Sequence, residues 1–167
     1  VSSLEVARDP LGPTGGAALF DRAAFEQVGG FDERIFLYYE DLDLALRMRI
    51  AGHHCRLAAD ARATHESSAT LGRGSAAKYR QTGFSRGYLL RKYGVMHHPS
   101  LALKVALSDT SAGLAQLVAD RTPAGLKGRA EGWRAATGIE SLEPPFDHLE
   151  PASLRRHLAV RLNRRRY

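Results

Sequence analysis

The stretch FDERIFLYYEDLDLALRMRIAG, residues 31–52, constrains this chain more than any other part of its sequence. An aromatic and aliphatic run leads directly into the acidic residues Glu40, Asp41 and Asp43. The apolar residues that follow recur at helical spacings, and Gly52 is a typical helix end. We therefore predict a helix whose first turn lies at or just after Glu40 and Asp41.

The first turn of a helix suits acidic side chains. Carboxylates there face unpaired backbone N–H groups and the positive end of the helix dipole. Glu40 and Asp41 are then expected to be ionised, ready to accept a proton or to bind a cation, although helix capping alone explains this pattern equally well. Asp43 points to a different face from Asp41, and we interpret it as a surface or supporting residue. Arg47, four residues later, is predicted to pair with it.

Further motifs lie on both sides of this helix. They are Gly15-Gly16, Arg22, the VGGFDE turn at 28–33, the EDLDL motif at 40–44, Arg47, Gly52 and His65. In this order and at this spacing they resemble the C-terminal half of the catalytic domain of inverting family 2 glycosyltransferases, especially their bacterial rhamnosyltransferase-type members. The resemblance covers residues 15–70. It implies an α/β fold, namely a partial GT-A (Rossmann-like) catalytic domain followed by a C-terminal helical region.

The resemblance also implies roles for single residues. Asp41 would be the general base that takes the proton of an acceptor hydroxyl in a single displacement at the anomeric carbon. Glu40 would orient the acceptor or hold Asp41. Gly15 and Gly16, at the start of a strand predicted at 17–20, would line the donor or acceptor site; a tight turn into a packed strand is the alternative.

A loop and a histidine complete the predicted site. Arg73, in the loop 66–78 rich in Ser, Thr and Gly, would contact the donor phosphates, with a solvated linker as the alternative. His65 ends the second of two predicted short strands, 55–59 and 62–65. The resemblance makes it a ligand for Mg²⁺ or Mn²⁺, and a structural histidine is the alternative. Since one ligand cannot hold a metal, cation binding would require the missing N-terminal half.

Family members begin with a nucleotide-binding half that carries a D-x-D motif, and this sequence shows no such half. We therefore expect a fragment of a longer enzyme, inactive alone. The predicted organisation is the C-terminal half of the catalytic domain at 1–74, a helical extension at 75–139, and a linker with a basic tail at 140–167. Helices are predicted at 22–28 (capped by Asp21), 79–93, 101–119 and 123–138.

Composition limits the classes of partner and the compartment expected for this chain. The net charge of +6 suits nucleic acid, anionic lipid or nucleotide-sugar phosphates without choosing among them. The lone Cys55 excludes an internal disulfide and fits a reducing compartment. The resemblance implies a nucleotide-sugar donor, with dTDP-rhamnose as first choice, and a polysaccharide or lipid-linked acceptor of the cell envelope. The expected location is cytoplasmic, at the inner face of the membrane with peripheral association, and nucleic acid is not an expected partner.

A second hypothesis belongs to a different class. A non-catalytic, basic helical module could bind anionic lipid or nucleic acid through its Arg-rich end. The mixture of Arg, Lys and Tyr in 79–93 is typical of an interfacial helix, and an ordinary packing helix is the alternative. This hypothesis leaves the acidic motif at 40–44 unexplained.

Overall fold

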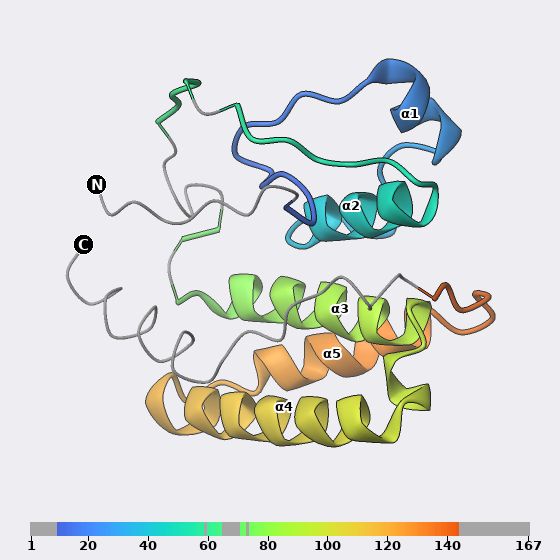
Figure 1. Cartoon of the computed structure of the whole chain (residues 1–167). Coiled ribbons are helices and arrows are strands. Elements are labelled where there is room, and N and C mark those ends of the chain that lie inside the picture. The colour runs from blue at the N-terminus through green and yellow to red at the C-terminus, as the bar shows by residue number, and fades with distance from the viewer. Residues whose placement is uncertain (1–9, 59, 65–70, 73, 144–167) are drawn as a thin grey trace.

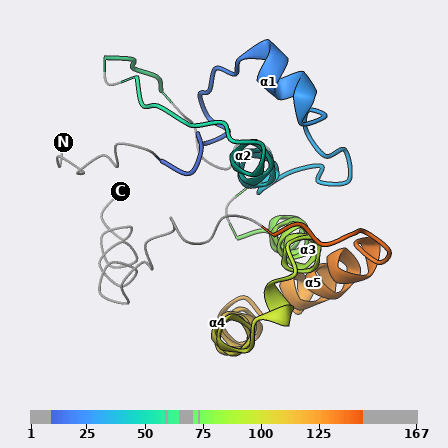
Figure 2. The ribbon, with the colours of Figure 1, turned by 45° about the vertical axis from the view of Figure 1, so that its right-hand side comes forward.

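The computed structural model describes residues 10–58, 60–64, 71–72 and 74–143. Its regular elements are α1 (Arg22–Gln27), α2 (Glu40–Ile50), α3 (Ala76–Lys92), the 3₁₀ turn η1 (Val95–His97), α4 (Pro99–Ala119) and α5 (Ala124–Ala135). Helices α3 and α5 lie side by side, with α2 on one side of this pair and α4 on the other (Figure 1). The turned view in Figure 2 shows the same arrangement, with α2 and α4 seen nearly end-on.

The predicted α/β fold is wrong for the described residues, which contain no β-strand. Residues 17–20 and 53–58 have irregular backbone, and the side chain of Leu19 is fully exposed. A strand is stable only when its backbone groups are paired with a neighbouring strand. No described segment pairs with either stretch, so the Rossmann-like sheet implied by the resemblance is not seen here.

The predicted helices are confirmed, and local chemistry explains their ends. Asp21 caps α1, since its carboxylate accepts a hydrogen bond from the N–H of Ala24 at 2.9 Å. The hydroxyl of Ser75 caps α3 in the same way. Pro99 begins α4, a position where its missing N–H costs nothing. Gly52, with a φ of +84°, follows α2 in the left-handed conformation that glycine adopts easily.

Helix α3 is the centre of the hydrophobic core. Its Tyr88 and Leu89, with Tyr93 directly after it, pack against Ile35 and Leu46. The basic residues of α3 are engaged within the fold: Arg80 pairs with Glu131, Arg86 with Asp109, and Lys92 with Asp32 and Asp43. These contacts support the packing interpretation of 79–93.

Glycines let α3 and α5 approach backbone to backbone. The contact is made by Gly83 and Gly87 on α3 and by Gly128 and Gly132 on α5. A methyl group at Gly132 would collide with the carbonyl oxygen of Phe84, and each of the other three would meet backbone in the same way. Small residues at this spacing are what a very close helix pair requires.

In the part of the chain that the structure describes, no helix combines the length and the apolar character needed to cross a bilayer.

Candidate functional site

The carboxylate of Asp41 lies in the first turn of α2 and is held by two backbone groups. Its Oδ2 accepts a hydrogen bond from the N–H of Gly15 at 2.8 Å, and its Oδ1 accepts one from the N–H of Leu42 at 2.8 Å. The side chain remains partly exposed. Each carboxylate oxygen has two lone pairs, so both can accept a second hydrogen bond from a molecule in solution.

Glu40 lies beside Asp41 at the same glycine. A methyl group at Gly15 would be 3.4 Å from Oε1 of Glu40 and 3.6 Å from Oδ2 of Asp41, so both carboxylates face this position. The other oxygen of Glu40, Oε2, is buried without a hydrogen-bond partner among the described residues. A buried polar atom without a partner is unusual in native proteins. Gly16 is exposed one residue further along.

The acidic pair follows a strained turn. Tyr38 and Tyr39 both have a φ of 66°, in the left-handed region. That region costs a residue with a side chain roughly 1–2 kcal/mol, and such strain persists only where surrounding contacts enforce it. The hydroxyl of Ser85 donates to the carbonyl oxygen of Leu37 at 3.1 Å, and the ammonium of Lys78 lies 5.5 Å from the ring centre of Tyr38. Contacts from α3 thus fix the turn that presents Glu40 and Asp41.

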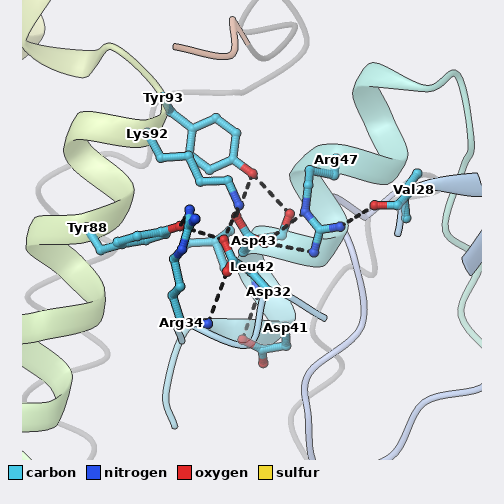
Figure 3. Close-up of polar contacts among 10 residues, drawn as sticks. All are labelled: Val28, Asp32, Arg34, Asp41, Leu42, Asp43, Arg47, Tyr88, Lys92 and Tyr93. Carbon is cyan, nitrogen blue, oxygen red and sulfur yellow. Dashed lines mark hydrogen bonds and ion pairs between the residues drawn. The ribbon is translucent and has the colours of Figure 1, made fainter. Parts of the chain in front are cut away.

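Asp43 is the anchor of α2, and its surface interpretation is wrong because its side chain is completely buried. Its Oδ1 lies 2.6 Å from Nζ of Lys92 and accepts a hydrogen bond from the hydroxyl of Tyr93 at 2.9 Å (Figure 3). Its Oδ2 accepts one from Nε of Arg47 at 2.8 Å, so the predicted Asp43–Arg47 pair is confirmed. Arg47 also donates to the carbonyl oxygen of Val28 at 2.6 Å.

Asp32, from the VGGFDE turn, belongs to the same cluster. Its Oδ2 accepts hydrogen bonds from Nζ of Lys92 at 2.8 Å and from the hydroxyl of Tyr88 at 2.7 Å (Figure 3). Burial opposes ionisation of Asp32, but the hydrogen bonds from Lys92 and Tyr88 outweigh burial and lower its pKa. Burial raises the pKa of Tyr88 to about 12. Burial and the charge of Asp43 raise the pKa of Tyr93, so both tyrosines are neutral donors at neutral pH. The cluster therefore joins α2, the 28–33 turn and α3 by charge and hydrogen bonding.

The segment before Gly15 is held against α2 by contacts that the sequence did not reveal. Arg49 donates to the carbonyl oxygen of Pro10 at 2.6 Å. Gly12 passes so close to α2 that a methyl group there would collide with Cβ of Ala45. The stretch 10–14 has no helix or strand, yet these contacts bring the N–H of Gly15 to Asp41.

Two predicted site residues, His65 and Arg73, lie outside the described residues. Among the described residues, no three His, Cys, Asp or Glu side chains come together as a metal site. Glu40 and Asp41 alone do not meet the ligand count that Mg²⁺ or Mn²⁺ requires. The predicted cation therefore stays a prediction, and no chemical step below is assigned to it.

Comparison with known proteins adds one partial similarity. No family model matches the chain, and no solved structure matches it. Two curated proteins, from the CDC 1551 / Oshkosh and ATCC 25618 / H37Rv strains of Mycobacterium tuberculosis, are each 42% identical to it over 71 residues. Both carry the name N-acetylglucosaminyl-diphospho-decaprenol L-rhamnosyltransferase. Part of this chain resembles a glycosyltransferase. The matched segment covers 42% of the chain and only 23% of each relative.

Proposed function

We propose that this chain supplies the acceptor-activating part of an inverting family 2 glycosyltransferase, with Asp41 as the general base. The observation that carries this proposal is the geometry at the start of α2. A partly exposed carboxylate is fixed there by two backbone N–H groups, one of them from Gly15. The partial similarity to a rhamnosyltransferase supports the same class of reaction.

The chemistry requires a carboxylate of this kind. A sugar hydroxyl is a poor nucleophile near neutral pH, so a base within hydrogen-bond reach must take its proton as it attacks the anomeric carbon. The two backbone hydrogen bonds orient Asp41 and leave one lone pair on each oxygen for the acceptor hydroxyl. The strained turn at Tyr38 and Tyr39 and the buried cluster around Asp43 hold α2 in place behind it.

Glu40 takes a second role in this proposal. Its carboxylate lies beside Asp41 at Gly15, where it would orient the acceptor or hold Asp41 in place. Gly15 has no side chain, and a methyl group there would lie against Oε1 of Glu40 and Oδ2 of Asp41. The glycine is therefore proposed to border the acceptor rather than to contribute chemistry.

The substrates are proposed by class. The relatives are named for L-rhamnose and for a diphospho-decaprenol-linked N-acetylglucosamine. We propose for this chain a nucleotide-sugar donor, with dTDP-rhamnose as first choice, and a lipid-linked glycan acceptor used in cell-wall biosynthesis. His65 remains a proposed ligand of the divalent cation, and Arg73 remains a proposed contact to the phosphates of the donor.

The proposal is tested by Asp41→Asn in the longest natural form of the protein that contains this chain. Asparagine keeps one oxygen acceptor but cannot take a proton. We expect sugar transfer to fall by about 10²–10⁴-fold, the usual contribution of a general base, with donor binding unchanged. Asp60→Asn, the same change at an exposed site, is the matched control. Full turnover by the Asp41→Asn protein would rule out the assignment.

A further inference from the structure

Helix α4 carries a long apolar surface on the side that faces away from the rest of the protein. Its large aliphatic side chains are well exposed: Leu103 by 62%, Leu107 by 65%, Leu114 by 57%, Leu117 by 47% and Val118 by 78%. These five residues, here called the α4 outer face, recur at spacings of three, four and seven, so they share one stripe of the helix. Exposed aliphatic side chains gathered in this way mark an interaction surface.

The opposite side of α4 attaches it to the fold mainly through polar contacts. Asp109 pairs with Arg86 of α3 at 2.7 Å and with Arg129 of α5 at 3.3 Å. Gly113 lies against the side chain of Leu126, and Asp120, directly after α4, accepts a hydrogen bond from the hydroxyl of Tyr79. These contacts fix which side of α4 faces outward, so the exposed stripe is a consequence of the fold rather than of an unanchored helix.

On α4 and in the chain directly after it, up to Lys127, exposed basic side chains outnumber the exposed acidic one, Asp120. The only acidic residue within α4 is Asp109, which is turned inward and paired. Lys104 is exposed on α4, and Arg121 and Lys127 are exposed where the chain passes into α5. This local excess of basic side chains suits an anionic surface.

We propose that the α4 outer face docks on an anionic lipid surface, with α4 lying in the plane of the headgroups. An amphipathic helix of this kind buries its apolar side at the boundary of headgroups and acyl chains, and neighbouring basic residues add attraction to anionic lipids. The 21 residues of α4 give a contact about 30 Å long at 1.5 Å per residue.

The docking surface deepens the proposed function and, in its biological meaning, rests on it. A lipid-linked acceptor resides in a membrane, so an enzyme that docks there searches two dimensions for its substrate. The surface itself follows from exposure and charge alone, and it can be tested without any sugar transfer.

The test is co-sedimentation of the full chain with vesicles of phosphatidylcholine alone and of phosphatidylcholine mixed with phosphatidylglycerol. We expect binding to the mixed vesicles that weakens with added salt. Leu107→Gln/Leu114→Gln should reduce this binding at least tenfold. Lys104→Gln should reduce it roughly fivefold, from about 1 kcal/mol per basic residue at an anionic surface.

The matched control is Leu57→Gln, because Leu57 is exposed by 57%, the same fraction as Leu114, but lies far from α4 in the sequence. It should bind vesicles like the unmodified chain. Circular dichroism of each variant checks that the helices are retained.

Several results would overturn the docking proposal. One is equal vesicle binding by Leu107→Gln/Leu114→Gln and the unmodified chain. Another is a homodimer, seen by analytical ultracentrifugation, that the double variant dissociates while no form of the chain binds vesicles; the face would then belong to a second copy. A third is binding that disappears on removal of 144–167 but survives the double substitution. Vesicle binding as expected, combined with full turnover by Asp41→Asn, would retain the docking surface and reject the proposed base.

Discussion

Helix α3 contacts α2 and α5 through two different kinds of interaction. Toward α2, the contact is a buried cluster of charged and hydroxyl groups centred on Lys92 and Asp43. Toward α5, the contact is backbone against backbone, made possible by glycines such as Gly87 and Gly132. Buried charges specify one arrangement because each group must find its partner, whereas glycines allow close approach and enforce it only by shape. The charged side is the one that supports the proposed site.

Removal of the Lys92 ammonium should cause the largest loss in the free energy of unfolding. Lys92→Met leaves Asp43 and Asp32 buried near each other without their shared cation, a change that typically costs about 3–5 kcal/mol. Urea unfolding followed by circular dichroism measures this loss. Asp43→Leu/Lys92→Leu should be less unstable than the sum of its single changes, because each single change already removes the Asp43–Lys92 pair. A double variant as unstable as that sum would indicate that Asp43 and Lys92 are not energetically coupled.

A methyl group at the glycine contact between α3 and α5 should cause the next largest loss in the free energy of unfolding. Gly132→Ala forces a side chain against the carbonyl of Phe84 and should cost about 2–3 kcal/mol, even though alanine favours helix formation. Gly113→Ala is the control, because its methyl group would meet the rotatable side chain of Leu126 rather than backbone. The control should change the free energy of unfolding by about 1 kcal/mol at most. Equal losses in both variants would mean that the close approach of α3 and α5 is not needed for stability.

Acidification should distinguish the α2 side of α3 from its α5 side, with a smaller effect on the free energy of unfolding. The pKa of Asp32 is lower in the folded protein than its ordinary value of 3.8, because hydrogen bonds from Lys92 and Tyr88 outweigh burial. Its stabilisation is therefore present above 3.8 and is lost as the pH falls through the folded pKa. The stability difference between the unmodified chain and Asp32→Asn should shrink on acidification. The cost of Gly132→Ala should depend less on pH, since the backbone atoms of Phe84 and Tyr88 that its methyl group would meet do not titrate. A parallel acid dependence of both would remove the contrast.

The sequence predicted what depends on neighbours along the chain. Apolar spacing and caps such as Asp21 and Ser75 are local, so the helices were found. Arg47 was found as the partner of Asp43 because helix geometry brings the fourth residue back to the same side. Lys92 was not found as a partner, since nothing in its own surroundings points to a residue 49 positions earlier; this separation is 92 minus 43.

Two other features escaped sequence reasoning for physical reasons. A strand at 17–20 was predicted from its short apolar run, but strands depend on partners elsewhere, and none lies beside it in the described residues. The left-handed turn at Tyr38 and Tyr39 had no signal, because glycine or asparagine normally marks that conformation. The position of Asp41 beside Gly15 was expected only through the resemblance, and the contacts of Arg49 and Gly12 that produce it were not anticipated.

The turn at Tyr38 and Tyr39 also links backbone strain to the positions of Glu40 and Asp41. Glycine at either position would relax the backbone, yet it would free the peptide that aims the two carboxylates, and at position 39 it would also remove a side chain that packs against the core. Attempts to raise the thermal stability of this protein should leave Tyr38 and Tyr39 unchanged.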